Sequence, residues 1–176
     1  MAGTNKIPER LINYRVYREG NDLIGTANVT LPSIEAMTDT VSGAGIAGEV
    51  ETPVLGHFGS TTVTLQFRTV DGDMTTLAAQ KAHALDIRGS QQVYDASLGE
   101  YKTVPVKLVL RGIPKTLNLG SFEPGSTTDS EVELEVTYLK LDIDGKTKLE
   151  LDKMNYIFKV GETDFLASVR KDLGLA

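Results

Sequence analysis

The 176-residue sequence has no cysteine, no tryptophan and only two histidines. Without cysteine, the chain can form no disulfide, thiol nucleophile or thiolate metal site. Aromatic residues make up 6% of the chain, which argues against a deep aromatic pocket. No stretch is long and apolar enough to span a bilayer, and the N-terminus lacks a signal-peptide core, so we expect no membrane anchor. The length predicts one domain, residues 1–176, with a core of its own.

Basic residues are outnumbered, 18 against 24 acidic ones, which gives a formal net charge of −6. A protein that reads nucleic acid needs a basic face to neutralise phosphates, so this charge argues against that class. It suits a surface past which a polyanion moves without binding.

The sequence offers no catalytic set, no metal set and no cofactor loop, so we expect no enzyme and no cofactor. His57 lies in a glycine-rich segment, and we expect His83 on a helix, away from its apolar side. Gly43, Gly45 and Gly48 match the spacing of a dinucleotide loop. The preceding residues are too polar for a central parallel strand, however, and Pro53 discourages the helix that must follow. We interpret this segment as loop backbone.

Residues 130–160 are the most regular part of the chain. Val132, Leu134 and Val136 alternate with glutamates, as in a strand with one dry face, and the alternation changes phase near residue 139. A two-residue turn at 144–145 would place apolar residues opposite charged ones. We therefore predict a three-residue loop, 143–145, in a hairpin of two long strands. That register pairs Leu139 with Leu149, Leu134 with Met154 and Val132 with Tyr156.

The remaining pattern predicts shorter strands at 12–17, 23–31, 61–70, 86–96 and 101–111, followed by a connector at 112–128. Asp73 can cap a helix over 74–85, and Thr163 or Asp164 can cap a terminal helix over 165–173. Many strands and only two short helices do not give the alternation of a βαβ fold. We predict a mainly β protein: an antiparallel β-sandwich or partly open β-barrel with one flanking α-helix, a short C-terminal helix and a long extended loop.

That loop falls within residues 32–60, which are rich in glycine and threonine but also carry scattered apolar side chains. A disordered tail would lack such side chains, so we expect residues 33–58 to protrude and dock on another subunit or ring. The residues expected to do so are Ile34, Met37, Val41, Gly43, Gly45, Ile46, Gly48, Val50, Val54, Leu55, His57 and Phe58.

A row of carboxylates accompanies the long hairpin. No apolar wall is present to raise the pKa of one of them, so a catalytic pair is not indicated. A solvated face is one interpretation, and a wet, negatively charged passage is the other. The residues predicted to line such a lumen are Glu131, Glu133, Glu135, Glu150 and Asp152.

Three stretches resemble the major tail tube proteins of contractile-tailed phages and contractile bacteriocins. They are LPSIEAMTDTVSGAGIAGEVETPVLGHF, VKLVLRGIPKTLNLGSFEPG and ELEVTYLKLDIDGKTKLELDKMNYIFKVGETDFLASVRKDLGL. Together they span most of the chain, with less likeness over 61–96. The resemblance implies a subunit related to type VI secretion ring proteins, forming hexameric rings that stack into a hollow tube within a contractile sheath.

The resemblance also implies partners and a location. The partners would be copies of the chain, the contractile sheath protein, a baseplate or tube initiator and a tape measure protein. DNA or ions would pass through the lumen, across the target cell envelope, without specific binding. The protein would assemble in the bacterial cytoplasm and belong to a virion tail or an extracellular contractile particle. Two alternatives remain: a type VI-like ring that carries effectors, and a monomeric β-barrel that binds a small molecule.

Overall fold

The computed structural model describes residues 5–25 and 28–175, and within them the protein is built on one large antiparallel sheet. Eight strands follow one another in the order β12-β11-β10-β9-β8-β7-β1-β2, while β6 joins β9 and carries β3. The elements are β1 (Lys6–Arg18), β2 (Asp22–Ile24), β3 (Asn28–Thr30), β4 (Ala36–Ser42), β5 (Glu49–Phe58), β6 (Thr62–Phe67), α1 (Gly72–Leu77), β7 (His83–Asp95), β8 (Glu100–Asn118), β9 (Ser130–Ile143), β10 (Lys146–Asp152), β11 (Ile157–Val160), β12 (Thr163–Asp164) and α2 (Ala167–Asp172). The predicted mainly β, antiparallel fold class is confirmed.

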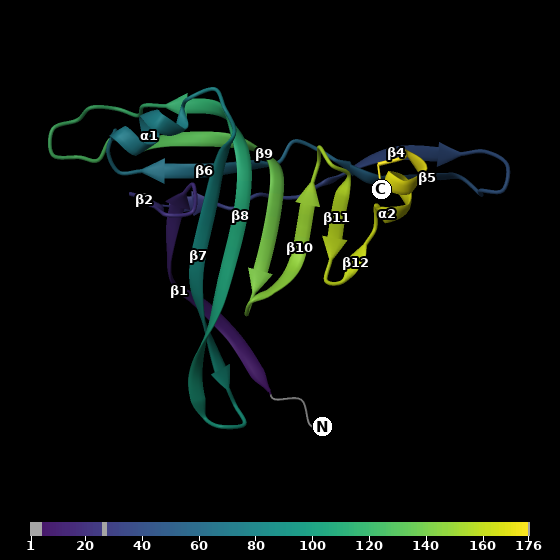
Figure 1. The fold of residues 1–176 in the computed structure, drawn as a ribbon, viewed down its shortest axis with the longest axis horizontal. Helices are drawn as coiled ribbons and strands as arrows, with labels where there is room; N and C mark the ends of the chain where they lie inside the picture. The colour runs from purple at the N-terminus through teal and green to yellow at the C-terminus, as the bar shows by residue number, and fades with distance from the viewer. Residues whose placement is uncertain (1–4, 26–27, 176) are drawn as a thin grey trace.

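Figure 1 shows the central strands side by side, with β6 running across their upper part and α1 at one end. The separate hairpin of β4 and β5 projects from the opposite end, next to α2. The long β7–β8 hairpin extends below the rest of the sheet. The core lies between the upper strands and α1, which buries Met74 and Leu77 completely.

Strand β9 organises this arrangement because it changes partner along its length. Its first half pairs with β6 and its second half with β10, while β8 pairs along most of it. Thr137 has no counterpart in the pairing with β8, where Arg111 faces Tyr138 and Gly112 faces Val136. Such a bulge moves the following residues to the other phase. It explains why the buried set changes from Val136 to Leu139.

The β9–β10 hairpin forms neither of the two registers considered from the sequence. Its turn is the two-residue Asp144–Gly145, both with positive φ, so the three-residue loop is wrong. A bulge at Lys148 then shifts the register, so that Leu141 faces Leu149 and Leu139 faces Leu151. The bulge brings apolar residues opposite one another, which the turn alone would not do. Val132 and Leu134 face β6 and β8 rather than Tyr156 and Met154.

The predicted helix over 74–85 is also wrong in extent. Helix α1 ends at Leu77, its cap is Asp71, whose carboxylate accepts the Met74 amide at 2.9 Å, and β7 begins at His83. Leu85 and Ile87 continue a strand alternation, and pairing with β8 overrides the helical spacing. His83 is therefore 1% exposed on a strand, with its Nε2 3.0 Å from the Ala79 carbonyl oxygen.

Three further boundaries differ. Strand β8 runs on to Asn118, into the predicted connector, because β9 continues to pair with it. The predicted long extended loop contains β4 and β5, paired as a hairpin. Helix α2 begins at Ala167 without a side-chain cap, while Asp164 accepts the Leu166 amide just before it.

Candidate assembly surface

The β4–β5 hairpin has exposed apolar side chains that the other described residues, 5–25 and 28–175, do not cover. Val41 faces Val50, whereas Ser42 faces Glu49 on the other side, and Val54 follows the last regular pair of β5. Each of the three valines is at least 40% exposed. A two-stranded hairpin is marginally stable by itself, so an apolar face of this kind needs a partner surface. Met37, Ile46 and Leu55 add further exposed apolar side chains.

The tip of the hairpin is made of glycine-containing turn. Gly43, Gly45 and Gly48 all have positive φ, and the Ile46 amide donates to the Gly43 carbonyl at 3.1 Å. The flanking elements are antiparallel strands, and no helix follows. The three glycines therefore serve a turn and do not form a dinucleotide loop.

The base of the hairpin packs on the C-terminal part of the chain. The rings of Phe58 and Phe158 lie 4.8 Å apart, and Phe165 follows at 5.9 Å from Phe158. Gly56 has φ of +74°, and a Cβ added there would lie 2.5 Å from the Leu166 side chain. Of the residues predicted to dock, Phe58 and Ile34 pack against the molecule's own core. His57 is exposed beside a pocket of about 230 Å³.

The five predicted lumen carboxylates do not form one row of free charges. Glu133 lies 3.4 Å from the Lys115 ammonium. Glu150 accepts the Tyr138 hydroxyl at 3.1 Å, and burial together with this carboxylate raises the pKa of Tyr138 to about 12. Asp152 accepts the Met154 and Asn155 amides in the turn after β10. Whether any of these residues faces a lumen stays a prediction.

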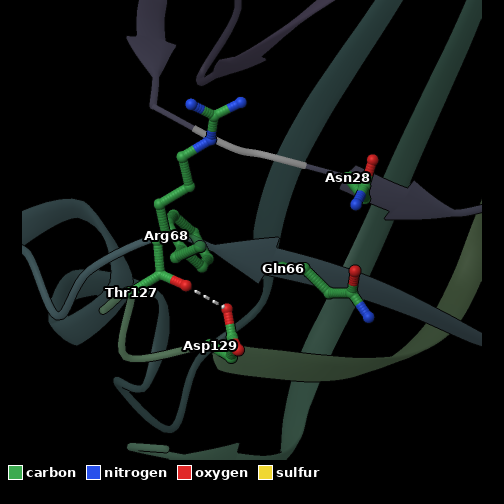
Figure 2. A pocket seen from close by; sticks show the side chains of 6 residues that line it. Asn28, Gln66, Arg68, Thr127 and Asp129 are labelled. Atoms are coloured by element: carbon green, nitrogen blue, oxygen red, sulfur yellow. Dashed lines mark hydrogen bonds between the residues drawn. The ribbon is translucent and has the colours of Figure 1, made fainter. Parts of the chain in front are cut away.

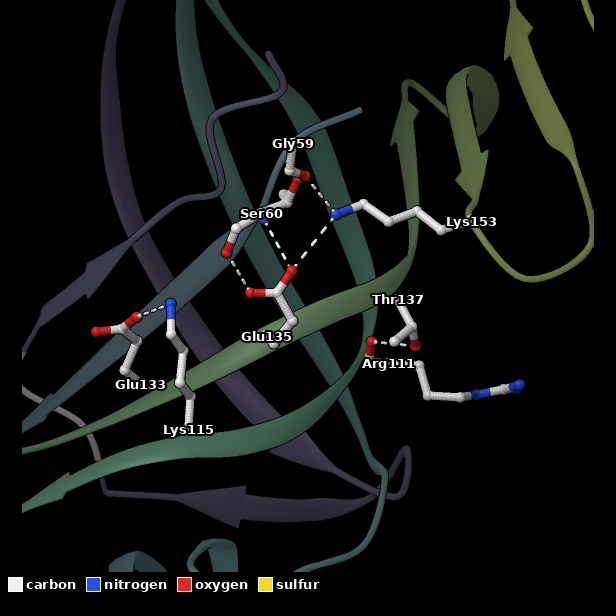
Figure 3. A network of polar contacts seen from close by, with 9 residues as sticks. Gly59, Ser60, Arg111, Lys115, Glu133, Glu135, Thr137 and Lys153 are labelled. Carbon is white, nitrogen blue, oxygen red and sulfur yellow. Dashed lines mark hydrogen bonds and ion pairs between the residues drawn. The ribbon is translucent and has the colours of Figure 1, made fainter. Parts of the chain in front are cut away.

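Figure 3 shows Glu135 next to residues 59–61 and Lys153. Its carboxylate accepts the Ser60 hydroxyl and the Thr61 amide, and it lies 3.5 Å from the Lys153 ammonium. Burial raises the pKa of Glu135, but these hydrogen bonds and the lysine charge outweigh it, and the net shift is downward. Sequence reasoning missed the partners, because no pattern connects residue 60 with residue 153.

A second open surface, also missed, lies along β1. Among the described residues, its outer edge pairs with β2 only at Val16–Arg18, and the strand is bulged at Glu9 and Ile12. Ile7, Leu11 and Ile12 on it are about half exposed. Next to this edge lies an apolar pocket of about 190 Å³, whose lining includes Leu11, Leu31, Ile87 and Val106. In the sequence, the apolar residues at positions 7, 11 and 12 were the signal that could have indicated this surface.

A polar pocket of about 490 Å³ lies at the C-terminal end of β6 (Figure 2). Asn28, Gln66, Arg68, Thr127 and Asp129 line it, and the Thr127 hydroxyl donates to the Asp129 carboxylate at 2.7 Å. The described residues contain no group of three or more His, Asp or Glu able to hold a metal. Nor do residues 5–25 and 28–175 contain a helix that is long and apolar enough to cross a membrane.

Comparison with known proteins gives a consistent result. A family model described as phage tail tube protein FII matches residues 8–174. The chain is 30% identical over 174 residues to the tail tube protein of Escherichia phage P2, covering 96% of this chain and 99% of that one. It is 25% identical over 154 residues to the major tail tube protein of Serratia phage KSP20, covering 87% and 88%.

Two solved structures of an extracellular contractile injection system share the fold. One is a chain of the PVC sheath/tube terminator in the extended state, with a TM-score of 0.53, 16% identity, and coverage of 77% of this chain and 96% of that one. The other is a chain of the PVC sheath–tube complex, with a TM-score of 0.52, 19% identity, and coverage of 77% and 91%.

Proposed function

The chain belongs to the phage tail tube protein FII family, and on this premise we propose that it is the structural subunit of the hollow inner tube of a contractile tail. Copies assemble into hexameric rings, and the rings stack into the tube. The molecule is a single tail-tube domain, from which the segment 33–58 protrudes to reach a neighbouring subunit or ring.

The observation that carries this proposal is the apolar face of the β4–β5 hairpin. Val41, Val50 and Val54 are exposed together on an element that cannot bury them against its own body. Among the described residues, the outer edge of β1 before Val16 has no paired strand, and closure of sheets around a ring removes such edges. Two unfinished surfaces on one subunit fit a head-to-tail contact that closes into a ring.

The proposed partners follow from the same assembly. The solved relatives come from a sheath–tube complex and a sheath/tube terminator, which supports a contractile sheath protein as the outer partner. A baseplate or tube initiator and a tape measure protein complete the tail. The net charge of −6 per subunit suits a lumen through which DNA or ions pass without binding. The protein has a structural role and no catalytic one.

The hairpin face can be tested with Val41→Thr and Val50→Thr together. Threonine keeps the β-branched shape, so the hairpin should remain folded while its face loses apolar surface. We expect the wild-type protein to form tubes in negative-stain micrographs. The double variant should need at least about a tenfold higher concentration to do so, at an unchanged melting temperature.

The matched control is Ser42→Ala with Glu49→Gln, the neighbouring pair on the opposite face. This variant should assemble as the wild type does. Compact monomers of the wild-type protein at high concentration, without rings or tubes, would contradict the proposal and favour a monomeric binding module. Normal tubes from the double valine variant would show that the hairpin face is not an assembly surface.

A further inference from the structure

The β4–β5 hairpin leaves the body at the point where the sheet divides. Strand β6 pairs with β9 up to Glu135, and β10 pairs with β9 from Tyr138 onward. The Val136 amide donates to the Thr61 carbonyl at 2.7 Å, and the Lys153 amide donates to the Thr137 carbonyl at 3.0 Å. The short segment of residues 59–61, which joins β5 to β6, therefore lies in the fork between the two branches.

Two charged side chains hold this segment from both sides (Figure 3). Glu135, on β9, accepts the Ser60 hydroxyl and the Thr61 amide. Lys153, in the turn after β10, donates to the Gly59 carbonyl at 2.7 Å and lies 3.5 Å from the Glu135 carboxylate. The two residues thus bind each other and also all three residues of the segment. Gly59 also donates to the Glu35 carbonyl at 2.9 Å, which brings the other end of the hairpin into the same arrangement.

We propose that Glu135 and Lys153 are positioning residues that fix the direction in which the β4–β5 hairpin leaves the body. The consequence, which rests on the proposed function, is that they determine which surface of the neighbouring copy the hairpin reaches. Neither residue lies on the hairpin itself, and neither has to touch the neighbouring copy. Glu135 is accordingly assigned to hairpin placement, and its place in the predicted lumen row stays a prediction.

The leverage of this contact is large because the hairpin is long. Strand β4 has seven residues, so the hairpin extends about 23 Å from its base at 3.3 Å per residue. A rotation of about 20° at the base would move the tip by about 8 Å over that length. That displacement exceeds the spacing of adjacent strands, so a small loosening at the base would misplace the apolar face.

The apolar packing at the base does not make these contacts redundant. Phe58 on Phe158, and Gly56 on Leu166, hold the end of β5 against the C-terminal segment. They do not bind residues 59–61, which alone connect β5 to β6. The polar contacts act on that connection and fix its orientation, because each hydrogen bond requires a defined direction.

The same strand supplies a matched control. Glu133 lies two residues before Glu135, and its partner Lys115 is on β8, the neighbouring strand of the sheet. This ion pair joins two strands that are already paired and has no contact with residues 59–61 that the structure records. Removing it changes charge and surface in a similar way without touching the hairpin base.

The experiment measures hairpin orientation in the unassembled protein. Because the chain has no native cysteine, Ala47→Cys at the tip of the hairpin and Lys146→Cys at the start of β10 allow two specific spin labels. Double electron–electron resonance then gives the distance distribution between them. The Val41→Thr and Val50→Thr changes are included throughout, to keep the protein from assembling.

We expect Glu135→Ala and Lys153→Met each to broaden this distribution at least about twofold, as for a released hinge. Lys153→Arg keeps a donor and a positive charge and should restore the narrow distribution. Glu133→Ala and Lys115→Met should leave it narrow. When Val41 and Val50 are restored, only Glu135→Ala and Lys153→Met should assemble poorly. Their melting temperatures should stay within a few degrees of the wild type.

The outcomes separate this inference from the proposed function. Narrow distributions in both Glu135→Ala and Lys153→Met, alongside normal wild-type tubes, would overturn the inference and leave the tube subunit intact. Broad distributions with no tubes from the wild-type protein would support the positioning role and overturn the proposed function. If Glu135→Ala fails to fold, Lys153→Met decides, because it keeps the apolar stem of the side chain.

Discussion

At the scale of single residues, the structure shows that some charged side chains form hydrogen bonds and ion pairs that the sequence does not reveal. Asp95, at the end of β7, is 1% exposed. Its carboxylate accepts the Ser97 hydroxyl and amide and binds the Lys102 ammonium at 2.9 Å. The Ser97 hydrogen bond, followed by Lys102, lowers the pKa of Asp95 to about 2. The sequence shows only an aspartate beside a turn, because the alternation of a strand does not reveal which polar groups form hydrogen bonds.

The lowered pKa predicts a specific acid response. In the unfolded chain an aspartate titrates near its ordinary pKa of about 3.9, so the unfolded state binds more protons than the folded state between that value and about 2. The stabilisation by Asp95 is therefore complete above about pH 4 and is lost as the pH falls toward 2. Asp95→Asn should flatten the pH dependence of the free energy of unfolding in that window.

Urea unfolding at several pH values measures this slope. Asp86, Glu135 and Asp164 also have lowered pKa values, so the slope should decrease without vanishing. Asp144→Asn, in the exposed β9–β10 turn, is the control for the removal of one carboxylate. If the Asp95→Asn protein keeps the wild-type slope of unfolding free energy between pH 2 and 4, the Asp95 carboxylate does not make these hydrogen bonds in solution.

At the scale of elements, the β9–β10 hairpin shows how a bulge reconciles a turn with a core. The Asp144–Gly145 turn sets one register, and the extra residue Lys148 shifts it by one, so that Leu149 and Leu151 face the leucines of β9. Deleting Lys148 would bring Leu149 directly opposite Leu141 in the register of the turn. Deleting Glu150 instead would turn Leu151, which is 2% exposed, out of the core.

We predict opposite results for these two deletions. Loss of Lys148 should be tolerated, at a cost of about 1–2 kcal/mol in the free energy of unfolding, mainly from altered twist. Loss of Glu150 should cost more than about 3 kcal/mol, because a buried leucine leaves the core. Denaturant unfolding of both variants tests this directly. Equal destabilisation would mean that the bulge, and not the leucine register, is what the hairpin requires.

At the scale of the whole molecule, two surfaces of the described subunit have no partner within it. The outer edge of β1 and the valine face of β4–β5 are both exposed, although the core beneath β6 and α1 is fully buried. An unpaired edge exposes amides that another chain can bond. We therefore expect assembly to cover these two surfaces while the core stays unchanged.

Hydrogen–deuterium exchange should report that completion. We expect the amides of β1 before Val16 that point away from β7, and those of β4 and β5, to exchange quickly in the free protein and at least about tenfold more slowly in tubes. Amides of β8, which pairs with β7 and β9 on its two sides, should be protected in both states. Unchanged exchange along β1 in assembled tubes would exclude its edge from the subunit interface.

The sequence by itself determined the class of the fold, since the alternation at Val132, Leu134 and Val136 reports locally which face of a strand is dry. It also marked residues 33–58 as a segment with scattered apolar side chains and no strong period, of which the structure packs Ile34 and Phe58 on the core. Tertiary structure alone decided where that segment became strand, how far α1 extended, and that His83 is buried. It alone placed Glu135 beside Lys153 and residues 59–61. These features depend on which strands meet, and pairing across dozens of residues leaves no local period to detect.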